Sequence, residues 1–325
     1  MSVPIRSAQP QTPRHRASIA SALTPDACKL SVLRLKVILN PAAGRGRARR
    51  HAREAEAYLR ELGASVDVHV SSSPEDLTRV AAEASRDRYD RVVVCGGDGS
   101  LHLALREFDL DRGTLALLPL GSGDDFARVL GIPRDLRRAC EIAAGSETRE
   151  VDVATANGTR YLGVAGLGFD SEVARFANER VRLLRGSLVY LYAIFRVLPR
   201  FRPIPVRIDN SRHEQIMFAT VSNSGQYGGG IRIMPDALLD DGQLDLCLVL
   251  RISRIELLKT LPKAYRGGHL SSSFVETARS HQFRFESERA LDVYADGERI
   301  TTTPVVFAVE DRRLKIAAPA KRAGG

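Results

Sequence analysis

The sequence lacks the cysteine patterns that mark disulfide-stapled or zinc-binding proteins. Its 325 residues contain four cysteines, Cys28, Cys95, Cys140 and Cys247, which lie far apart and form no CxxC pair. Scattered free thiols are typical of a reducing compartment. No apolar run approaches the roughly 20 residues that span a bilayer, and the first 30 residues lack the apolar core of a signal peptide. We therefore expect a cytoplasmic protein without disulfides.

The composition does not indicate a disordered or fibrous chain. With 44% hydrophobic and 27% charged residues, it is ordinary globular material, and its length allows two domains. The net charge of +9 suits nucleic acid, an anionic membrane or phosphorylated small molecules. Because the arginines are dispersed and no recognition motif is present, we do not expect a nucleic-acid partner.

The first half alternates strand and helix patterns, which predicts a doubly wound parallel sheet with helices on both faces. The pattern predicts strands over residues 33–39, 65–70, 90–95 and 114–118, and helices over 46–62, 74–85, 124–130 and 136–144.

The second half is richer in strands. Two helical stretches, 180–202 and 255–265, interrupt short alternating runs, which favour a sandwich or barrel. We predict a flexible extension over 1–32, a nucleotide domain over 33–150, a β-rich substrate domain over 151–317 and a tail over 318–325. The last residues of the β-rich domain are candidates for packing back on the first domain. The predicted strands cover 159–164, 205–209, 217–222, 243–249, 282–286, 290–295 and 305–309.

Three glycine-rich turns follow predicted strands of the first half. They are Asn40–Gly44, Gly96–Ser100 and Pro119–Arg128. Glycine lets backbone N–H groups approach a phosphate, and a helix N-terminus favours its charge. One such turn is ordinary, but three at successive strand ends predict a nucleotide site. No Gly-Lys-Ser/Thr exists, so this is not a Walker P-loop, and we interpret the glycine string at Gly163–Phe169 as structural.

Two acidic turns mark the second half. Pro235–Leu246 reads PDALLDDGQLDL, and Ala295–Glu298 reads ADGE. Each is compatible with a simple hairpin turn. Phosphoryl transfer also needs carboxylates, as Mg²⁺ ligands and as a proton acceptor. Asp241 and Glu298 are candidates for those roles.

Taken together, NPAAG, GGDGS, PLGSGDDFAR, the aspartate of EVDVA, LLDDGQLDL and ADGE occur in the order and rough spacing of the diacylglycerol kinase catalytic family. This family includes soluble bacterial diacylglycerol kinases, YegS-like lipid kinases, sphingosine kinases and ceramide kinases. The resemblance covers residues 33 to about 317. It implies an α/β nucleotide domain, a C-terminal β-sandwich domain and an active site that holds ATP and Mg²⁺ in the cleft between them.

The resemblance also implies roles for individual residues. Glu298 matches the proton acceptor, Asp98 is an alternative base, and Asp296, in the same acidic turn as Glu298, is a third catalytic candidate. Asp98, Asp125 and Asp152 match the acidic network around Mg²⁺–ATP. Asp241 matches a structural Mg²⁺ ligand, with the carbonyls of Leu238 and Gln243. The other nucleotide-site candidates are Asn40, Pro41, Ala42, Ala43, Gly44, Arg45, Ser71, Gly97, Gly99, Ser100, Leu101, His102, Leu103, Ser122 and Arg128.

The chain departs from the family pattern at two motifs. The family usually has GGDGT-x-N-E, whereas this chain has GGDGSLHL, so His102 and Leu103 replace an amide and a carboxylate. In the next motif, Ser122 and Asp124 replace threonine and asparagine. Asp124 adds a negative charge near the expected phosphates.

The segment 180–202 combines a dense apolar cluster with flanking arginines. It is compatible with a buried helix, or with a surface that docks on anionic lipid. The sequence therefore predicts an ATP-dependent lipid kinase that acts on diacylglycerol or a related lipid, with peripheral membrane contact and an exposed strand edge that could support a homodimer. A kinase of a soluble substrate, similar to NAD kinases, and a non-catalytic nucleotide- or lipid-binding module remain alternatives.

Overall fold

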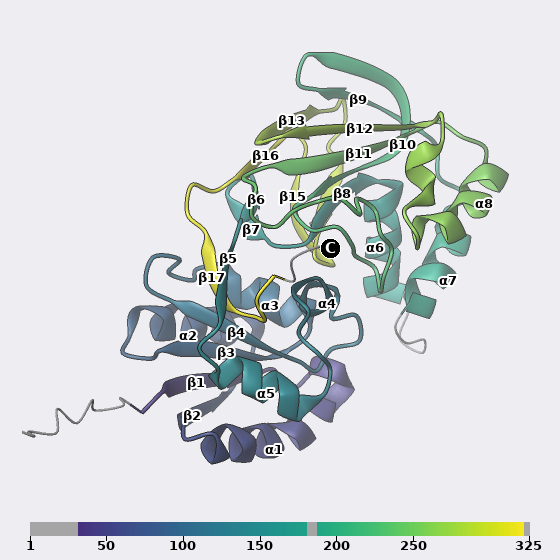
Figure 1. Ribbon diagram of the computed structural model, residues 1–325. Helices are drawn as coiled ribbons and strands as arrows, with labels where there is room; N and C mark the ends of the chain where they lie inside the picture. Colours follow the sequence, from purple (N-terminus) through teal and green to yellow (C-terminus); the bar gives the residue numbers. More distant parts are fainter. Residues whose placement is uncertain (1–31, 181–186, 322–325) are drawn as a thin grey trace, which may run out of the picture. The chain divides into compact units, whose positions relative to one another are not determined.

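The computed structural model describes residues 32–180 and 187–321 (Figure 1). The predicted extension over 1–32 lies outside the described residues except for its last residue. Cys28 and residues 181–186 of the predicted lipid-facing segment also lie outside them. Cys95, Cys140 and Cys247 are buried free thiols.

The first sheet has the strand order β2-β1-β3-β4-β17-β5 and forms the core of an α/β domain. Strands β1 (Arg34–Leu39), β2 (Ser65–Val70), β3 (Arg91–Gly96) and β4 (Thr114–Pro119) are parallel, as the alternating pattern predicts. Every residue of β3 is buried, because helices cover both faces of the sheet (Figure 1). The helical elements are η1 (Ala43–Gly46), α1 (Arg47–Glu61), α2 (Pro74–Arg86), α3 (Asp98–Leu105), α4 (Asp125–Leu130) and α5 (Leu136–Ala144).

The second sheet is antiparallel, which agrees with the β-rich pattern of the second half. Its path runs β15-β14-β8-β10-β9-β13-β16-β6-β7, and β11 joins β10 to β12. The bounds are β6 (Ala154–Ala156), β7 (Thr159–Tyr161), β8 (Val164–Gly168), β9 (Ile204–Ile208), β10 (Ser211–Ser222), β11 (Leu244–Leu250), β12 (Val275–Ser280), β13 (Gln282–Glu286), β14 (Asp292–Ala295), β15 (Glu298–Thr302) and β16 (Val305–Val309).

The two faces of this sheet bury different cores. Along β11, Leu246 and Leu248 contribute to an all-β core, whereas Cys247 and Val249 contribute to a second core. Helices α6 (Phe169–Arg180), α7 (Ser187–Val197), α8 (Arg254–Ala264) and η2 (Gly268–Ser271) also contribute to the second core. They gather on one side of the sheet (Figure 1).

The chain returns to the first sheet at its end. Strand β17 (Leu314–Ala317) inserts between β4, to which it is parallel, and β5 (Thr148–Val151), to which it is antiparallel. The polypeptide thus passes between the two sheets after β5 and again before β17. Our sequence patterns missed β5, β6, β12, β15 and β17, because short or solvent-facing strands carry little hydrophobic alternation. The strand predicted over 159–164 covers β7 but only the first residue of β8, which is buried along its whole length and rich in glycine.

Among the described residues, none of the helices is both long and apolar enough to cross a membrane.

Candidate active site

The glycine turns after β3 and β4 lie against each other. A Cβ on Gly121 would lie 2.5 Å from the Gly97 Cα, and the backbone N–H of Leu120 donates to the Gly96 carbonyl at 2.9 Å. A side chain at either contacting glycine would push the two turns apart. The first turn joins them, because Asn40 Nδ2 donates to Ser100 Oγ at 2.9 Å. The three predicted turns therefore form one edge of the domain.

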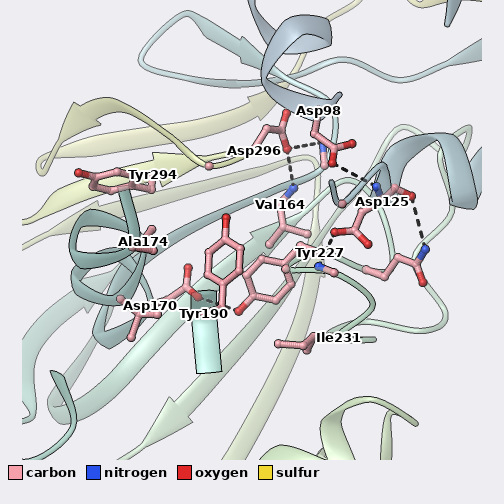
Figure 2. A pocket seen from close by; sticks show the side chains of 18 of the residues that line it. Asp98, Asp125, Val164, Asp170, Ala174, Tyr190, Tyr227, Ile231, Tyr294 and Asp296 are labelled. Atoms are coloured by element: carbon pink, nitrogen blue, oxygen red, sulfur yellow. Dashed lines mark hydrogen bonds between the residues drawn. The ribbon is translucent and has the colours of Figure 1, made fainter. Parts of the chain in front are cut away.

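Asp98 links the second turn to the start of α4. Its carboxylate accepts hydrogen bonds from the backbone N–H groups of Asp125 (3.1 Å) and Phe126 (3.2 Å) (Figure 2). Burial, together with the nearby Asp125 carboxylate, raises the pKa of Asp98. Asp125 in turn accepts from Arg128 Nη1 at 2.6 Å and from the Gly229 N–H at 2.6 Å.

Asp124, one of the departures from the family pattern, stabilises the turn between β4 and α4. Its backbone is left-handed, with φ at 51°, and its Oδ1 accepts from the Gly121 N–H at 2.9 Å. Oδ2 lies 3.1 Å from Arg134 Nη2. Burial raises the pKa of Asp124 to about 6. The Asp124 side chain is not among the residues that line the adjacent cavity, and its two oxygens are bound by Gly121 and Arg134.

The ADGE turn brings two further carboxyl groups to the same place. Asp296 accepts from three consecutive backbone N–H groups, those of Leu162 (3.0 Å), Gly163 (3.0 Å) and Val164 (3.2 Å). Burial raises its pKa to about 7. Glu298 faces the start of α3, since a Cβ on Gly99 would lie 3.8 Å from Glu298 Oε1.

Partial burial also raises the pKa of Glu298, which makes its carboxylate a stronger base. His102 is buried beside Asp296, with Nδ1 3.9 Å from Asp296 Oδ2, and neither ring nitrogen has a hydrogen-bond partner among the described residues. Burial lowers the pKa of His102 to about 4, which keeps the ring neutral.

These groups open into a cavity of about 660 Å³. Carboxylates and glycine turns line its polar end, and α6, α7, α8 and the second sheet line its apolar end. Between the two ends, Tyr227 donates a hydrogen bond to the buried Asp170 at 2.7 Å, and the Tyr190 ring lies beside the pair (Figure 2). Burial raises the pKa of Asp170 to about 6 and that of Tyr190 to about 12.

Sequence reasoning missed Asp170, Tyr190 and Tyr227. The available signal was Gly166, because a Cβ there would lie 2.0 Å from Asp170 Oδ2. The glycine string that we interpreted as structural also belongs to the site, because Gly163, Val164 and Phe169 line the cavity and Gly166 leaves room for the Asp170 side chain.

The cavity gathers most of the predicted site residues. The predicted residues that line it are Asn40, Ala42, Ala43, Gly44, Gly97, Asp98, Gly99, Ser100, Leu101, Leu103, Ser122, Asp125, Asp296 and Glu298. Pro41, His102 and Arg128 are not among the residues that line the cavity, and the Arg45 side chain is outside the described part of the structure.

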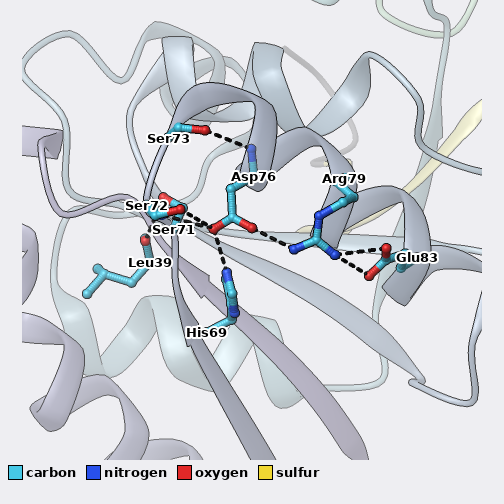
Figure 3. A network of polar contacts seen from close by, with 8 residues as sticks. All are labelled: Leu39, His69, Ser71, Ser72, Ser73, Asp76, Arg79 and Glu83. Carbon is cyan, nitrogen blue, oxygen red and sulfur yellow. Dashed lines mark hydrogen bonds and ion pairs between the residues drawn. The ribbon is translucent and has the colours of Figure 1, made fainter.

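Ser71 lies in the neighbouring β2–α2 turn rather than on the cavity wall. Its Oγ donates to the Leu39 carbonyl at 3.1 Å (Figure 3). The turn is fixed by Asp76, which accepts from the Ser72 N–H at 2.9 Å and pairs with His69 Nε2 at 2.8 Å. These hydrogen bonds hold the pKa of Asp76 well below its usual range. Ser71 thus stabilises the turn that precedes Pro74, which does line the cavity.

Asp152, the third member of the expected acidic network, does not line the cavity, and its place in that network stays a prediction. One Asp152 oxygen binds Arg313 Nε at 2.8 Å, and the other accepts from the Gly242 N–H at 2.6 Å. Arg313 immediately precedes β17. Asp152 is thus bound to two segments where the chain passes between the sheets, whereas Asp296 lines the polar end of the cavity with Asp98 and Asp125.

The predicted structural Mg²⁺ ligands, Leu238, Asp241 and Gln243, share one loop. Asp241 Oδ1 accepts from the Gln243 N–H at 3.0 Å, and Oδ2 lies 3.5 Å from Arg279 Nη1. No cluster of three or more His, Cys, Asp or Glu side chains suited to a metal occurs in the described part of the chain. The Arg279 guanidinium already balances the Asp241 charge, so this metal site stays a prediction.

For a nucleotide-bound Mg²⁺, the polar end of the cavity fits better. Asp98 and Asp125 offer hard oxygen ligands there, and the Asp98 carboxylate has no cationic partner among the described residues.

Comparisons with known proteins agree with this architecture. The diacylglycerol kinase catalytic domain model matches residues 34–156, and the YegS C-terminal NAD kinase beta sandwich-like domain model matches residues 163–318. The chain is 32% identical over 296 residues to the diacylglycerol kinase of Mycobacterium tuberculosis, covering 88% of this chain and 95% of that protein.

Other relatives align over comparable lengths. The chain is 27% identical to the diacylglycerol kinase of Bacillus subtilis, covering 89% of this chain and 98% of that one. It is 30% identical to a YegS-like lipid kinase of Chromohalobacter salexigens, covering 82% and 88%. A crystal structure of a diacylglycerol kinase from Bacillus anthracis superposes with a TM-score of 0.69 at 21% identity, covering 90% and 99%, and shares the fold.

Proposed function

Because this chain belongs to the diacylglycerol kinase family, we propose that it transfers the γ-phosphoryl group of ATP to the hydroxyl of a lipid, with diacylglycerol as the leading candidate. The observation that carries the proposal is the two-ended cavity. Its polar end combines glycine turns with carboxylates, and its other end is apolar over three helices and a sheet face. A phosphate donor and an acyl-bearing acceptor need these two environments side by side.

The residues of the chain have separable tasks in this reaction. Backbone N–H groups of the glycine turns bind the phosphates, and the apolar end positions the lipid chains. Glu298 accepts the proton of the attacking hydroxyl, and Asp296 holds the Glu298 turn in place. Asp98 and Asp125 would hold a Mg²⁺ ion, whose chemistry is to neutralise charge on the phosphates.

The neighbourhood of Glu298 supports its role as the base. Its raised pKa makes a better proton acceptor than an ordinary surface carboxylate. Asp98 is less suited, because both of its oxygens already accept backbone hydrogen bonds. We expect Glu298→Gln to lower kcat by about 10²- to 10⁴-fold, which is the range for loss of a general base.

The test is transfer of label from γ-labelled ATP to a panel of diacylglycerol, sphingosine, ceramide and phosphatidylglycerol in mixed micelles, with NAD as a soluble acceptor. Asp98→Asn and Glu298→Gln are the variants, and Asp87→Asn, at an exposed helix end, is the matched control. Labelled lipid that disappears in the two variants and persists in the control supports the proposal. Label in NAD alone, or in no acceptor when the protein is folded, overturns it.

A further inference from the structure

We propose that α7 and α8 form the surface by which the protein docks on an anionic lipid bilayer, and that the lipid acceptor enters the cavity between them. This inference rests on the proposed function, because only an acceptor that resides in a membrane needs such a route. In Figure 1 the two helices lie beside each other at one edge of the β-rich domain.

Helix α7 is apolar on two faces. Its inner face includes Tyr190 and Ile194, which line the cavity, and Ala193, which is fully buried. The outer face repeats at the i, i+3, i+4, i+7 spacing of a single helical stripe. Its side chains are large and exposed, with Leu188 at 58% and Phe195 at 53%, and the stripe consists of Leu188, Leu191, Tyr192 and Phe195. Water is a poor environment for such a stripe, which indicates a partner.

Helix α8 repeats this arrangement. Leu257 and Leu258 line the cavity, whereas Ile255 is 66% exposed at the start of the helix and Tyr265 is exposed just after its end. A groove of about 720 Å³ lies at the surface between the helices, with Leu191 from α7 and Tyr265 beside α8 on its walls.

Leu261 lines both this surface groove and the inner cavity. Leu261 is therefore a point at which the surface groove and the apolar end of the cavity adjoin. An acyl chain leaving a bilayer could pass between α7 and α8 without exposure to water.

The charge on the two helices favours an anionic partner. Arg196, Lys259 and Lys263 are exposed, and none of them forms an ion pair with a described residue. Glu256 supplies the acidic charge of α8, but its carboxylate is held by the Ser253 backbone N–H and hydroxyl. Basic side chains around an apolar stripe are suited to anionic head groups around acyl chains. A second copy of the chain is a poorer occupant, because a two-fold contact would bring like charges together.

The experiment uses the full chain and sedimentation with vesicles of phosphatidylcholine, with or without phosphatidylglycerol. Phe195→Glu is the test variant, and Leu62→Glu, at an exposed position after α1, is the matched control. We expect Phe195→Glu to weaken binding to anionic vesicles by at least about tenfold, because one large apolar side chain no longer enters the bilayer. The double variant Lys259→Gln/Lys263→Gln should lose the preference for phosphatidylglycerol.

A second measurement separates docking from catalysis. Turnover of a short-chain diacylglycerol that dissolves as a monomer should be the same in Phe195→Glu and the unchanged protein, whereas turnover of vesicle-embedded diacylglycerol should fall with binding. Vesicle binding that Phe195→Glu leaves intact, or a change in its oligomeric state, overturns the docking surface. Intact vesicle binding with no phosphorylation of any acceptor overturns the proposed function instead.

Discussion

Replacing Asp296 by asparagine should change how stability depends on pH. Burial raises the pKa of this carboxyl group from 3.8 to about 7. In the unfolded chain the group ionises near pH 4, but in the folded protein it stays protonated up to about pH 7. The stability it contributes is therefore fully present below pH 4 and is lost as the pH rises through 7. Asparagine has no such titration.

The size of the effect follows from the pKa shift. Between pH 5 and pH 8, the unchanged protein loses stability over about two pH units, until the folded carboxyl group ionises near 7. At about 1.4 kcal/mol per unit, this amounts to about 3 kcal/mol. Asparagine also turns an amide N–H₂ toward the Leu162 N–H, which costs about 1 kcal/mol. That cost is the same at both pH values and cancels in the comparison.

The assay is urea unfolding of both proteins at pH 5 and pH 8. We compare the unfolding free energy of Asp296→Asn with that of the unchanged protein at each pH. This difference should be about 3 kcal/mol more favourable to the variant at pH 8 than at pH 5. Asp87→Asn is the control, because its carboxylate is exposed. If the difference between Asp296→Asn and the unchanged protein is the same at pH 5 and pH 8, the reasoning about this buried carboxyl group is refuted.

Three further outcomes are expected. Gly121→Ala should weaken ATP binding at least about tenfold by calorimetry, because its Cβ would lie 2.5 Å from the Gly97 Cα, whereas Gly268→Ala meets only ordinary contacts. Tyr227→Phe should lower the unfolding free energy by about 1 kcal/mol in urea, because Asp170 loses its hydrogen-bond donor. kcat/KM should fall as the pH drops through the raised pKa of Glu298, and Glu298→Gln should abolish this acid limb.

The strand and helix order of the first domain could be predicted because its hydrophobic periodicity is strong. Strands such as β3 and β4 are continuous apolar runs ending in glycine turns, which is typical of buried parallel strands. The insertion of β17 between β4 and β5 could be raised only as a candidate. A strand of four residues, of which only Lys315 is exposed, carries too little pattern to specify a pairing partner about 200 residues earlier in the chain.

Site residues could be predicted where reactive side chains occur in a local sequence motif. They could not be predicted where their role depends on contacts between segments that are far apart in the sequence. Gly97 and Asp98 could be identified as site candidates because they belong to the local motif GGDGS. By contrast, Asp152 carries the same carboxyl group but is bound by Arg313, a contact across about 160 residues. Asp170 is preceded by four apolar or glycine residues, and nothing local indicates that Tyr227 will donate to it.

The chain passes between its two sheets after β5 and again before β17. These two connections explain how one cavity can have a polar end and an apolar end. Asp296 lies in the turn between β14 and β15 of the second sheet, and the charge of Asp98, at the start of α3 in the α/β domain, helps to raise its pKa. Asp152 and Arg313 bind each other at the point where the chain enters and leaves the β-rich domain. The polar end is therefore held from both sides, whereas the apolar end depends on α7 and α8, whose outer faces are exposed. If the lipid enters there, substitutions on the outer faces should alter access of the acceptor and leave ATP affinity unchanged, which ATP titration of Phe195→Glu measures directly.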